Sequence, residues 1–210
     1  MRDKPFVSPP PSVNAYVVEL LERLNAHDPA THDHCRSVGA WSGLLAKALR
    51  LEPGDVKVAV LAGTLHDIGK AATPLEILLK SGPLTEREWE RMRAHAGDGA
   101  AMLTEIPALR FVAPIVRWHH ELVDGRGYPD GLAGERIPLL SRIVAVSDAF
   151  HAMITTRPYR EASTVVEALG ELRSGRGTQF DAAVVDAMLE LVAAKTQRAT
   201  SAPLRDVRAS

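Results

Sequence analysis

Apolar residues recur at helical spacing along most of the chain, and no stretch keeps the alternation of an amphipathic strand. A helical stripe over 13–25 follows Ser12, a residue type that caps helix N-termini. Asp28-Pro29 has the sequence of a second helix start. Residues 55–66 are apolar nearly all round, as expected for a buried helix. The pattern therefore predicts an all-α helical bundle.

The second half of the chain continues this helical pattern around one long loop. Thr85 and Glu88 have the spacing of a capping box at a helix start. The apolar stripe of that helix consists of Trp89, Met92, Ala96, Gly99, Leu103 and Ile106. Residues 121–137 contain four glycines and exceed the usual ~4–6 residues of a connection, which favours a functional loop. Pro138 begins another helix. Two amphipathic helices complete the pattern, at 163–173 and 181–195.

The 210 residues are enough for one domain with a full hydrophobic core. We expect a flexible Pro-rich segment over 1–12, one folded domain over 13–195 and a disordered polar tail over 196–210. The net charge of −1 offers no electrostatic basis for binding long nucleic acid or an anionic membrane. No apolar run approaches the ~20 residues of a membrane helix. The single cysteine, Cys35, and the lack of an apolar leader favour the cytoplasm.

Several titratable residues occupy positions where the pattern calls for apolar ones. His34 begins the apolar face of its helix, and Asp148 lies inside the apolar run VAVSDAF. Each residue alone is compatible with a satisfied core position, but a buried carboxylate without a partner would take up a proton. Five histidines and two aspartates share this unusual placement, which indicates a metal site. They are His34, His66, Asp67, His95, His119, His120 and Asp148.

The adjacent pair His66-Asp67 is the centre of this interpretation. The two carboxylate oxygens of Asp67 can bridge ions about 3.5–4 Å apart, as in two-metal hydrolases. The other expected ligands of one ion are His34, His66 and Asp148. Those of the second ion are His95, His119 and His120. This set contains no thiolate, which points to iron, manganese or zinc rather than copper or an iron–sulfur cluster. We expect two divalent ions and favour iron or manganese, with zinc as an alternative. Lys70 lies one helical turn past His66 and can contact a phosphate, although alone it would suit an ordinary helix C-terminus.

The motifs in this order resemble the HD superfamily of phosphohydrolases and, more narrowly, its HD-GYP family. They include His66-Asp67 extended to Lys70, the loop motif Gly127-Tyr128-Pro129, and Arg157-Pro158-Tyr159-Arg160. The resemblance implies an HD-domain bundle with a long GYP loop. It also implies a cyclic di-GMP phosphodiesterase that forms linear pGpG, and in some members GMP, through attack by a metal-bridging hydroxide.

Carried over by position, the resemblance implies the same seven metal ligands. It assigns catalytic roles to Asp67 and Lys70. It assigns substrate contacts to Lys70, Tyr128, Arg157 and Arg160. The GYP loop is implied as a surface for a second copy of the chain or another protein partner.

Three positions depart from the family pattern. Ala30 stands where some members have a third metal ligand, so two ions are expected. Ser37 replaces a usual arginine, and His151 replaces an aspartate that can line the substrate pocket. Two alternatives to a cyclic di-GMP hydrolase remain open: a cyclic di-GMP receptor or docking module with weak catalysis, and an HD phosphohydrolase for another cyclic dinucleotide.

Overall fold

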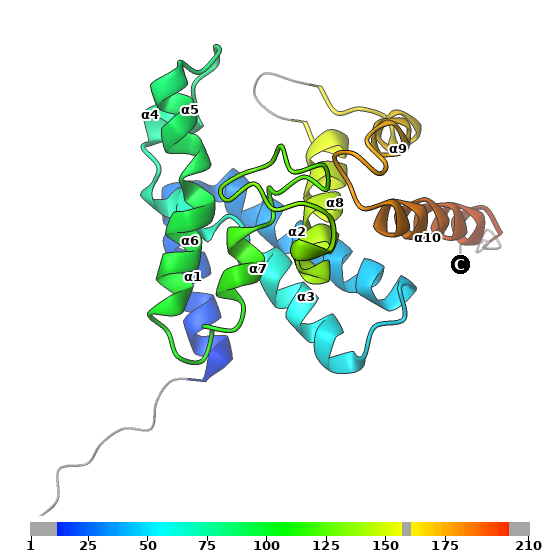
Figure 1. The fold of residues 1–210 in the computed structure, drawn as a ribbon, viewed down its shortest axis with the longest axis horizontal. Coiled ribbons are helices and arrows are strands. Elements are labelled where there is room, and N and C mark those ends of the chain that lie inside the picture. Colours follow the sequence, from blue (N-terminus) through cyan, green and yellow to red (C-terminus); the bar gives the residue numbers. More distant parts are fainter. Residues whose placement is uncertain (1–11, 157–160, 202–210) are drawn as a thin grey trace, which may run out of the picture.

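The computed structural model describes residues 12–156 and 161–201. Within these ranges the chain forms helices joined by turns and loops, without a β-strand (Figure 1). Arg176 and Phe180 form an isolated β-bridge. The predicted all-α fold is therefore confirmed. No helix in this part of the chain is both long and apolar enough to cross a membrane.

The first half of the chain begins with helices that start where the sequence predicts. The Ser12 side chain accepts a hydrogen bond from the Ala15 amide, and Asp28 caps the second helix in the same way through Ala30. These elements are α1 (Val13–His27), α2 (Pro29–Ala48), α3 (Pro53–Leu65), the 3-10 helix η1 (Ile68–Ala72) and α4 (Leu75–Leu78).

Glycines allow α2 and α3 to pack closely as an antiparallel pair. A β-carbon on Gly63 would lie only 2.9 Å from the Gly39 α-carbon and 2.7 Å from Ser42 Oγ. One on Gly39 would lie 2.1 Å from Thr64 Oγ1. Backbones this close leave no room for a side chain between them. The contact sets the register of α2 against the end of α3, where His66 and Asp67 follow.

The helix predicted from Thr85 onwards is divided in two. It consists of α5 (Glu86–Arg93) and α6 (His95–Thr104), separated at Ala94. The Thr85–Glu88 capping box is present as predicted. The stripe itself is only partly correct, because Ala96, Gly99 and Leu103 are buried whereas Trp89 is 48% exposed. The reason is that α5 projects away from the bundle beside α4, so its apolar residue has no core to enter (Figure 1).

The remaining elements flank the long loop. They are α7 (Ala113–Arg117), the short 3-10 helix η2 (Gly134–Arg136), α8 (Leu139–Ile154), α9 (Val165–Ser174) and α10 (Ala182–Ser201). The predicted loop over 121–137 is present except for η2. The helix α10 extends beyond the predicted end at 195, and Thr196 bonds within it to the Val192 carbonyl. The predicted end of this helix at 195 is therefore wrong, and the disordered tail stays a prediction. The flexible segment over 1–11 and the tail from 202 lie outside the described residues.

Two hydrophobic clusters share the central helices α2, α3 and α8. The first joins α1, α6 and α7 to the N-terminal part of α2 and the end of α3. The second joins α9 and α10 to α8, the C-terminal part of α2 and the start of α3. In Figure 1, α1, α6 and α7 lie on one side of the central helices, and α9 and α10 lie on the other. The central helices therefore carry side chains that can meet between the two clusters.

We predict that Gly69→Ala destabilises the protein, because η1 touches the start of α6 at this glycine. The added β-carbon would lie 2.0 Å from the His95 carbonyl oxygen and 2.6 Å from the Gly99 nitrogen. Overpacking of this kind costs about 1–3 kcal/mol of unfolding free energy. Urea unfolding followed by circular dichroism measures the loss.

The matched control is Gly54→Ala in the first turn of α3, where a β-carbon meets nothing within 4 Å. This change should leave the stability unchanged or raise it by up to about 1 kcal/mol. Equal effects of the two substitutions would contradict the close contact between η1 and α6.

Candidate metal centre

The seven predicted ligands come from the central helices and from helix ends. His34 lies within α2 and Asp148 within α8. His66 follows α3, Asp67 precedes η1, and His95 is the first residue of α6. His119 and His120 follow the end of α7, where the helical direction is lost and both rings can turn inward. The bundle thus brings together residues that are more than a hundred positions apart.

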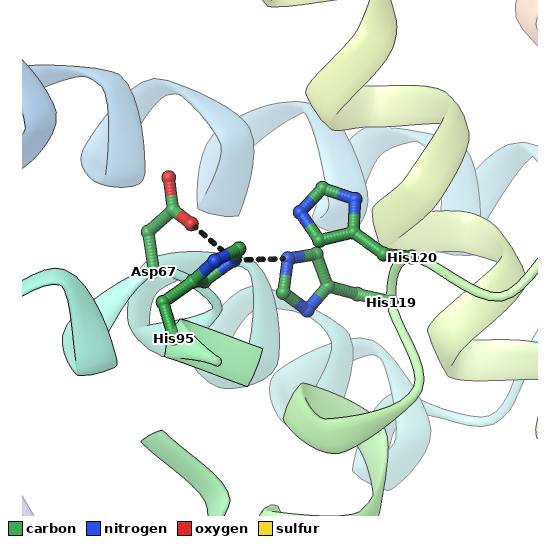
Figure 2. Close-up of side chains that lie close together, drawn as sticks. All are labelled: Asp67, His95, His119 and His120. Atoms are coloured by element: carbon green, nitrogen blue, oxygen red, sulfur yellow. Dashed lines mark hydrogen bonds and ion pairs between the residues drawn. The ribbon is translucent and has the colours of Figure 1, made fainter. Parts of the chain in front are cut away.

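These side chains form two compact groups. One consists of Asp67, His95, His119 and His120, and the other of His34, His66 and Asp148. Within each group, one ligand atom per residue lies within 4.8 Å of the others. Figure 2 shows the first group converging from α6, from the start of η1 and from the turn after α7. The division agrees with the two predicted ligand sets; their occupation by metal stays a prediction.

The Asp67 carboxylate lies between the two groups and is only 2% exposed. Its Oδ1 is 3.1 Å from His95 Nε2, in the first group. Its Oδ2 is 3.3 Å from His66 Nε2, in the second group. One oxygen therefore faces each set, which is the geometry that a bridging carboxylate requires.

Backbone carbonyls orient three of the imidazole rings. The Nδ1 atoms of His66, His95 and His119 donate to the carbonyls of Gly63, Met92 and Val116 at 2.8, 2.6 and 2.6 Å. A carbonyl can only accept, so each Nδ1 carries a hydrogen, and Nε2 is the nitrogen that faces the cluster and would offer its lone pair to a metal. This is the tautomer that a metal ligand needs, held by an outer hydrogen bond.

The charges in the centre favour a bound cation. Burial alone would raise the pKa of Asp67, but Lys70 and His66 lower that pKa well below its ordinary value. Burial would also raise the pKa of Asp148, but the hydrogen bond with His34 and the nearby charges of His66, His34 and His120 together lower that pKa. Burial would lower the pKa of His66, yet Asp67 raises that pKa well above its ordinary value. The same carboxylates that attract a proton to His66 would attract a metal ion.

In the group that contains His119 and His120, the surroundings lower the pKa values of the histidines instead of raising them. Burial and the neighbouring histidines lower the pKa of His119 well below its ordinary value. The pKa of His120 falls to about 3, chiefly through burial and then through His95. Both rings are therefore neutral at physiological pH, as metal coordination requires.

Two buried polar atoms support the fit of this donor set to metal ions. His66 Nε2 and Asp67 Oδ1 are buried and have no hydrogen-bond partner in the described part of the chain. Buried polar atoms are normally satisfied, because leaving one unpaired costs about 1–3 kcal/mol. Imidazole nitrogens and carboxylate oxygens suit zinc, iron and manganese. The residues present can therefore hold metal ions, one on each side of Asp67.

Comparison with known families agrees with this arrangement. Residues 19–184 match the family described as HD domain. The chain belongs to the HD-domain family. The predicted resemblance to HD phosphohydrolases, and within them to HD-GYP proteins, is thereby confirmed.

Three curated relatives cover most of this HD domain. The cyclic di-GMP phosphodiesterase response regulator RpfG of Xanthomonas campestris is 43% identical over 173 residues, 81% of this chain and 46% of that protein. A cyclic di-GMP phosphodiesterase of Thermotoga maritima is 40% identical over 178 residues, covering 83% and 48% of the two chains. The 3'3'-cGAMP-specific phosphodiesterase 3 of Vibrio cholerae is 35% identical over 158 residues, covering 75% and 34%. The chain thus spans about half the length of the first two relatives.

A solved structure supports the fold of the HD domain. Bd1817 of Bdellovibrio bacteriovorus, described as an HDG"Y"P protein, superposes with a TM-score of 0.65 at 20% identity. The match covers 85% of this chain and 60% of that one.

The GYP loop of the HD domain is tied down beside the first ligand group. The Glu121 carboxylate is buried and accepts hydrogen bonds from the amides of Asp130 and Leu132 at 2.7 and 3.0 Å. Gly127 approaches the loop's own backbone, since a β-carbon there would lie 2.3 Å from the Leu122 nitrogen. The loop therefore folds back on the segment that follows His120.

Two of the four predicted substrate contacts can be located. Lys70 Nζ lies 2.5 Å from Asp67 Oδ2, and burial is outweighed by Asp67, which raises the pKa of Lys70. The Tyr128 ring stacks on the His120 ring at 4.8 Å between centroids. Tyr128 thus fits a role as a support for His120 as well as the predicted substrate contact. Arg157 and Arg160 lie outside the described residues.

The structure adds two neighbours that sequence reasoning missed. Arg93 places its guanidinium carbon 5.5 Å from the Tyr128 ring centroid and 5.7 Å from that of Trp89. Its position two residues before His95 was the available signal. Cys35 forms a third group of potential ligands with His66 and Asp67. Its sequence position next to His34 was the signal that places it on α2 near the same centre.

We predict that Asp130→Asn loosens the loop. Asp130 accepts bonds from Arg117 Nε and Nη2 and from Trp118 Nε1, all at 2.7 Å. The pKa of Asp130 is lowered to about 2, and the hydrogen bonds from Arg117 are the largest cause. The variant should speed hydrogen exchange of the Tyr128 amide, which bonds the His120 carbonyl at 3.2 Å.

The lowered pKa also sets a pH window for this contribution. Below about pH 4 the Asp130 carboxyl binds a proton in the unfolded chain, whereas in the folded protein it stays ionised until about pH 2. The stability that its bonds with Arg117 and Trp118 contribute is therefore present above about pH 4 and is lost as the pH falls toward 2. The stability difference between wild type and Asp130→Asn should shrink as the pH falls through this window. Asp124→Asn is the control, because Asp124 bonds only its loop neighbour Arg126 through its side chain. Equal acceleration of Tyr128 amide exchange in both variants would refute the proposed role of Asp130 in holding the loop.

Proposed function

We propose that this chain is a metal-dependent phosphodiesterase that hydrolyses cyclic di-GMP to linear pGpG. The observation that carries the proposal is the Asp67 carboxylate, with Oδ1 directed at His95 and Oδ2 at His66. Relatives 43% and 40% identical are named cyclic di-GMP phosphodiesterases, which supports the substrate. A complete pair of ligand sets favours turnover over a receptor role.

Two divalent ions are the proposed cofactors, with iron or manganese favoured over zinc. Bound ions would activate water near neutral pH and neutralise charge on the phosphoryl group. Asp67 would contact both ions. The ligands proposed for one ion are His34, His66 and Asp148. Those proposed for the other are His95, His119 and His120.

The remaining polar groups of the centre would bind and orient the substrate. The Lys70 side chain is 19% exposed and places its ammonium beside Asp67 Oδ2, where it would pair with a phosphate oxygen of the substrate. Arg93 stands beside Tyr128 at the outer side of the first ligand group, where it offers a second cation. His66, Asp67, His95 and His119 are buried, so the residues that would hold the ions are themselves shielded from bulk water.

We propose the bacterial cytoplasm as the setting of this reaction. We also propose that the GYP loop over 121–137 is a surface for a homodimer or another protein partner. The Arg126 side chain of this loop is 78% exposed and so is available for such a contact.

Replacement of Asp67 by alanine should abolish turnover and reduce metal binding. Loss of a direct ligand should exceed the 10–100-fold effect of an outer-shell change, so we expect a fall in rate of more than about 100-fold. The assay follows cyclic di-GMP and pGpG by chromatography, with protein loaded with manganese or ferrous iron under anaerobic conditions.

The matched control is Asp33→Ala, which removes an 80% exposed carboxylate next to His34 on α2. It should retain wild-type turnover. Equal turnover by the Asp67 and Asp33 variants would refute the proposed centre. Binding of cyclic di-GMP by fully metal-loaded wild type without product would instead identify a receptor.

A second candidate substrate is 3'3'-cGAMP, because the relative named for that activity is 35% identical. Wild-type protein offered equal amounts of both cyclic dinucleotides should consume cyclic di-GMP faster. Faster loss of 3'3'-cGAMP would refute the substrate assignment and leave the phosphodiester chemistry in place.

A further inference from the structure

His34 is held differently from three of the other histidines of the centre. The Nδ1 atoms of His66, His95 and His119 donate to backbone carbonyls. His34 Nδ1 instead lies 2.8 Å from Nδ1 of His151, a side chain that was not among the predicted ligands. The two rings have centroids 5.0 Å apart.

Helix geometry explains this difference. His66 and His119 follow the ends of α3 and α7, and His95 follows the break after α5. The last carbonyls of a helix have no intrahelical partner, so they are free to accept from a ring nitrogen. His34 lies within α2, where the preceding carbonyls are used by the helix itself. Its ring therefore needs an acceptor from another element.

The helix α8 supplies that acceptor and holds both nitrogens of the His34 ring. Asp148 Oδ1 lies 2.8 Å from His34 Nε2. His151, one helical turn further along α8, lies against Nδ1. Without a metal, His34 Nε2 can donate to the Asp148 carboxylate. If it is instead to offer its lone pair to a metal, the hydrogen must be on Nδ1, and His151 Nδ1 must accept it. The hydrogen of His151 is then on Nε2, which lies 3.3 Å from Thr155 Oγ1, a hydroxyl that can accept.

We infer that His151 is a positioning residue that orients His34 as a metal ligand and thereby controls one of the two metal positions selectively. That position is the one formed by His34, His66 and Asp148. Because an imidazole is a weaker acceptor than a carboxylate, it leaves His34 less basic and this ion less tightly held than an aspartate would. The inference rests on the proposed metal centre.

The test measures manganese binding to wild type, His151→Leu and His151→Asp by calorimetry, with electron paramagnetic resonance to distinguish paired from single ions. His151→Leu removes the acceptor and should weaken one of two binding events by about 10–100-fold. The other event should keep its affinity, and the spectrum should change from coupled to single manganese.

His151→Asp should have the opposite effect. A carboxylate oxygen branches from the γ-carbon as Nδ1 does in histidine, so it can occupy the same place and accept from His34. The binding event that His151→Leu weakens should in His151→Asp be at least as tight as in wild type. This rescue separates positioning from a merely structural role, because both substitutions remove the same ring from α8.

Met153→Leu is the control for a general disturbance of α8, since Met153 packs against the second hydrophobic cluster. It should leave both affinities unchanged. Unfolding of the metal-free variants by urea checks that each is folded.

Equal weakening of both events in His151→Leu, or weakening of the same event by His151→Asp, would overturn the inference. So would two unchanged affinities in His151→Leu. Failure of wild type to bind manganese, iron or zinc would refute the metal centre itself, and is thus distinguishable from failure of the His151 role.

Discussion

The Asp67 carboxylate is buried where η1 meets α6, and its negative charge must be compensated at that place. A buried ion without partners costs several kcal/mol, so the surrounding elements have to deliver positive or coordinating groups to it. Lys70 does so from the same turn, and His66 and His95 do so from α3 and α6. Much of the architecture can be understood as the means of holding these groups against one carboxylate.

Close backbone contacts provide the necessary precision. The glycines between α2 and α3 bring His34 within reach of the end of α3, and Gly69 lets η1 touch the His95 carbonyl. Helix ends then serve a second purpose, because their unpaired carbonyls orient the rings of His66, His95 and His119. The same residues that terminate the helices thus prepare the nitrogens that face the centre. His34 has no helix end to use, and α8 compensates with His151.

The loop after His120 is also held in place beside the centre. Glu121 and Asp130 fasten it with hydrogen bonds, and Tyr128 stacks on the His120 ring. The motif therefore has a clear structural purpose in supporting a candidate ligand. Arg93 joins it from α5, so that the aromatic and cationic groups beside the first ligand set come from separate elements.

The sequence alone determined the helical class and most helix starts. It also predicted two sets of candidate ligands, whose side chains the structure brings together and whose metal binding stays a prediction. These features depend on local periodicity, caps and motif order, all of which are present in the linear chain. It misjudged the stripe around Trp89 and the end of the last helix, because the direction of α5 and the length of α10 depend on packing. The contacts of His151 with His34, of Cys35 with His66 and of Arg93 with Tyr128 were decided only by the tertiary structure. Each depends on how helices distant in sequence are placed, and helical spacing carries no information about the side chains of another helix.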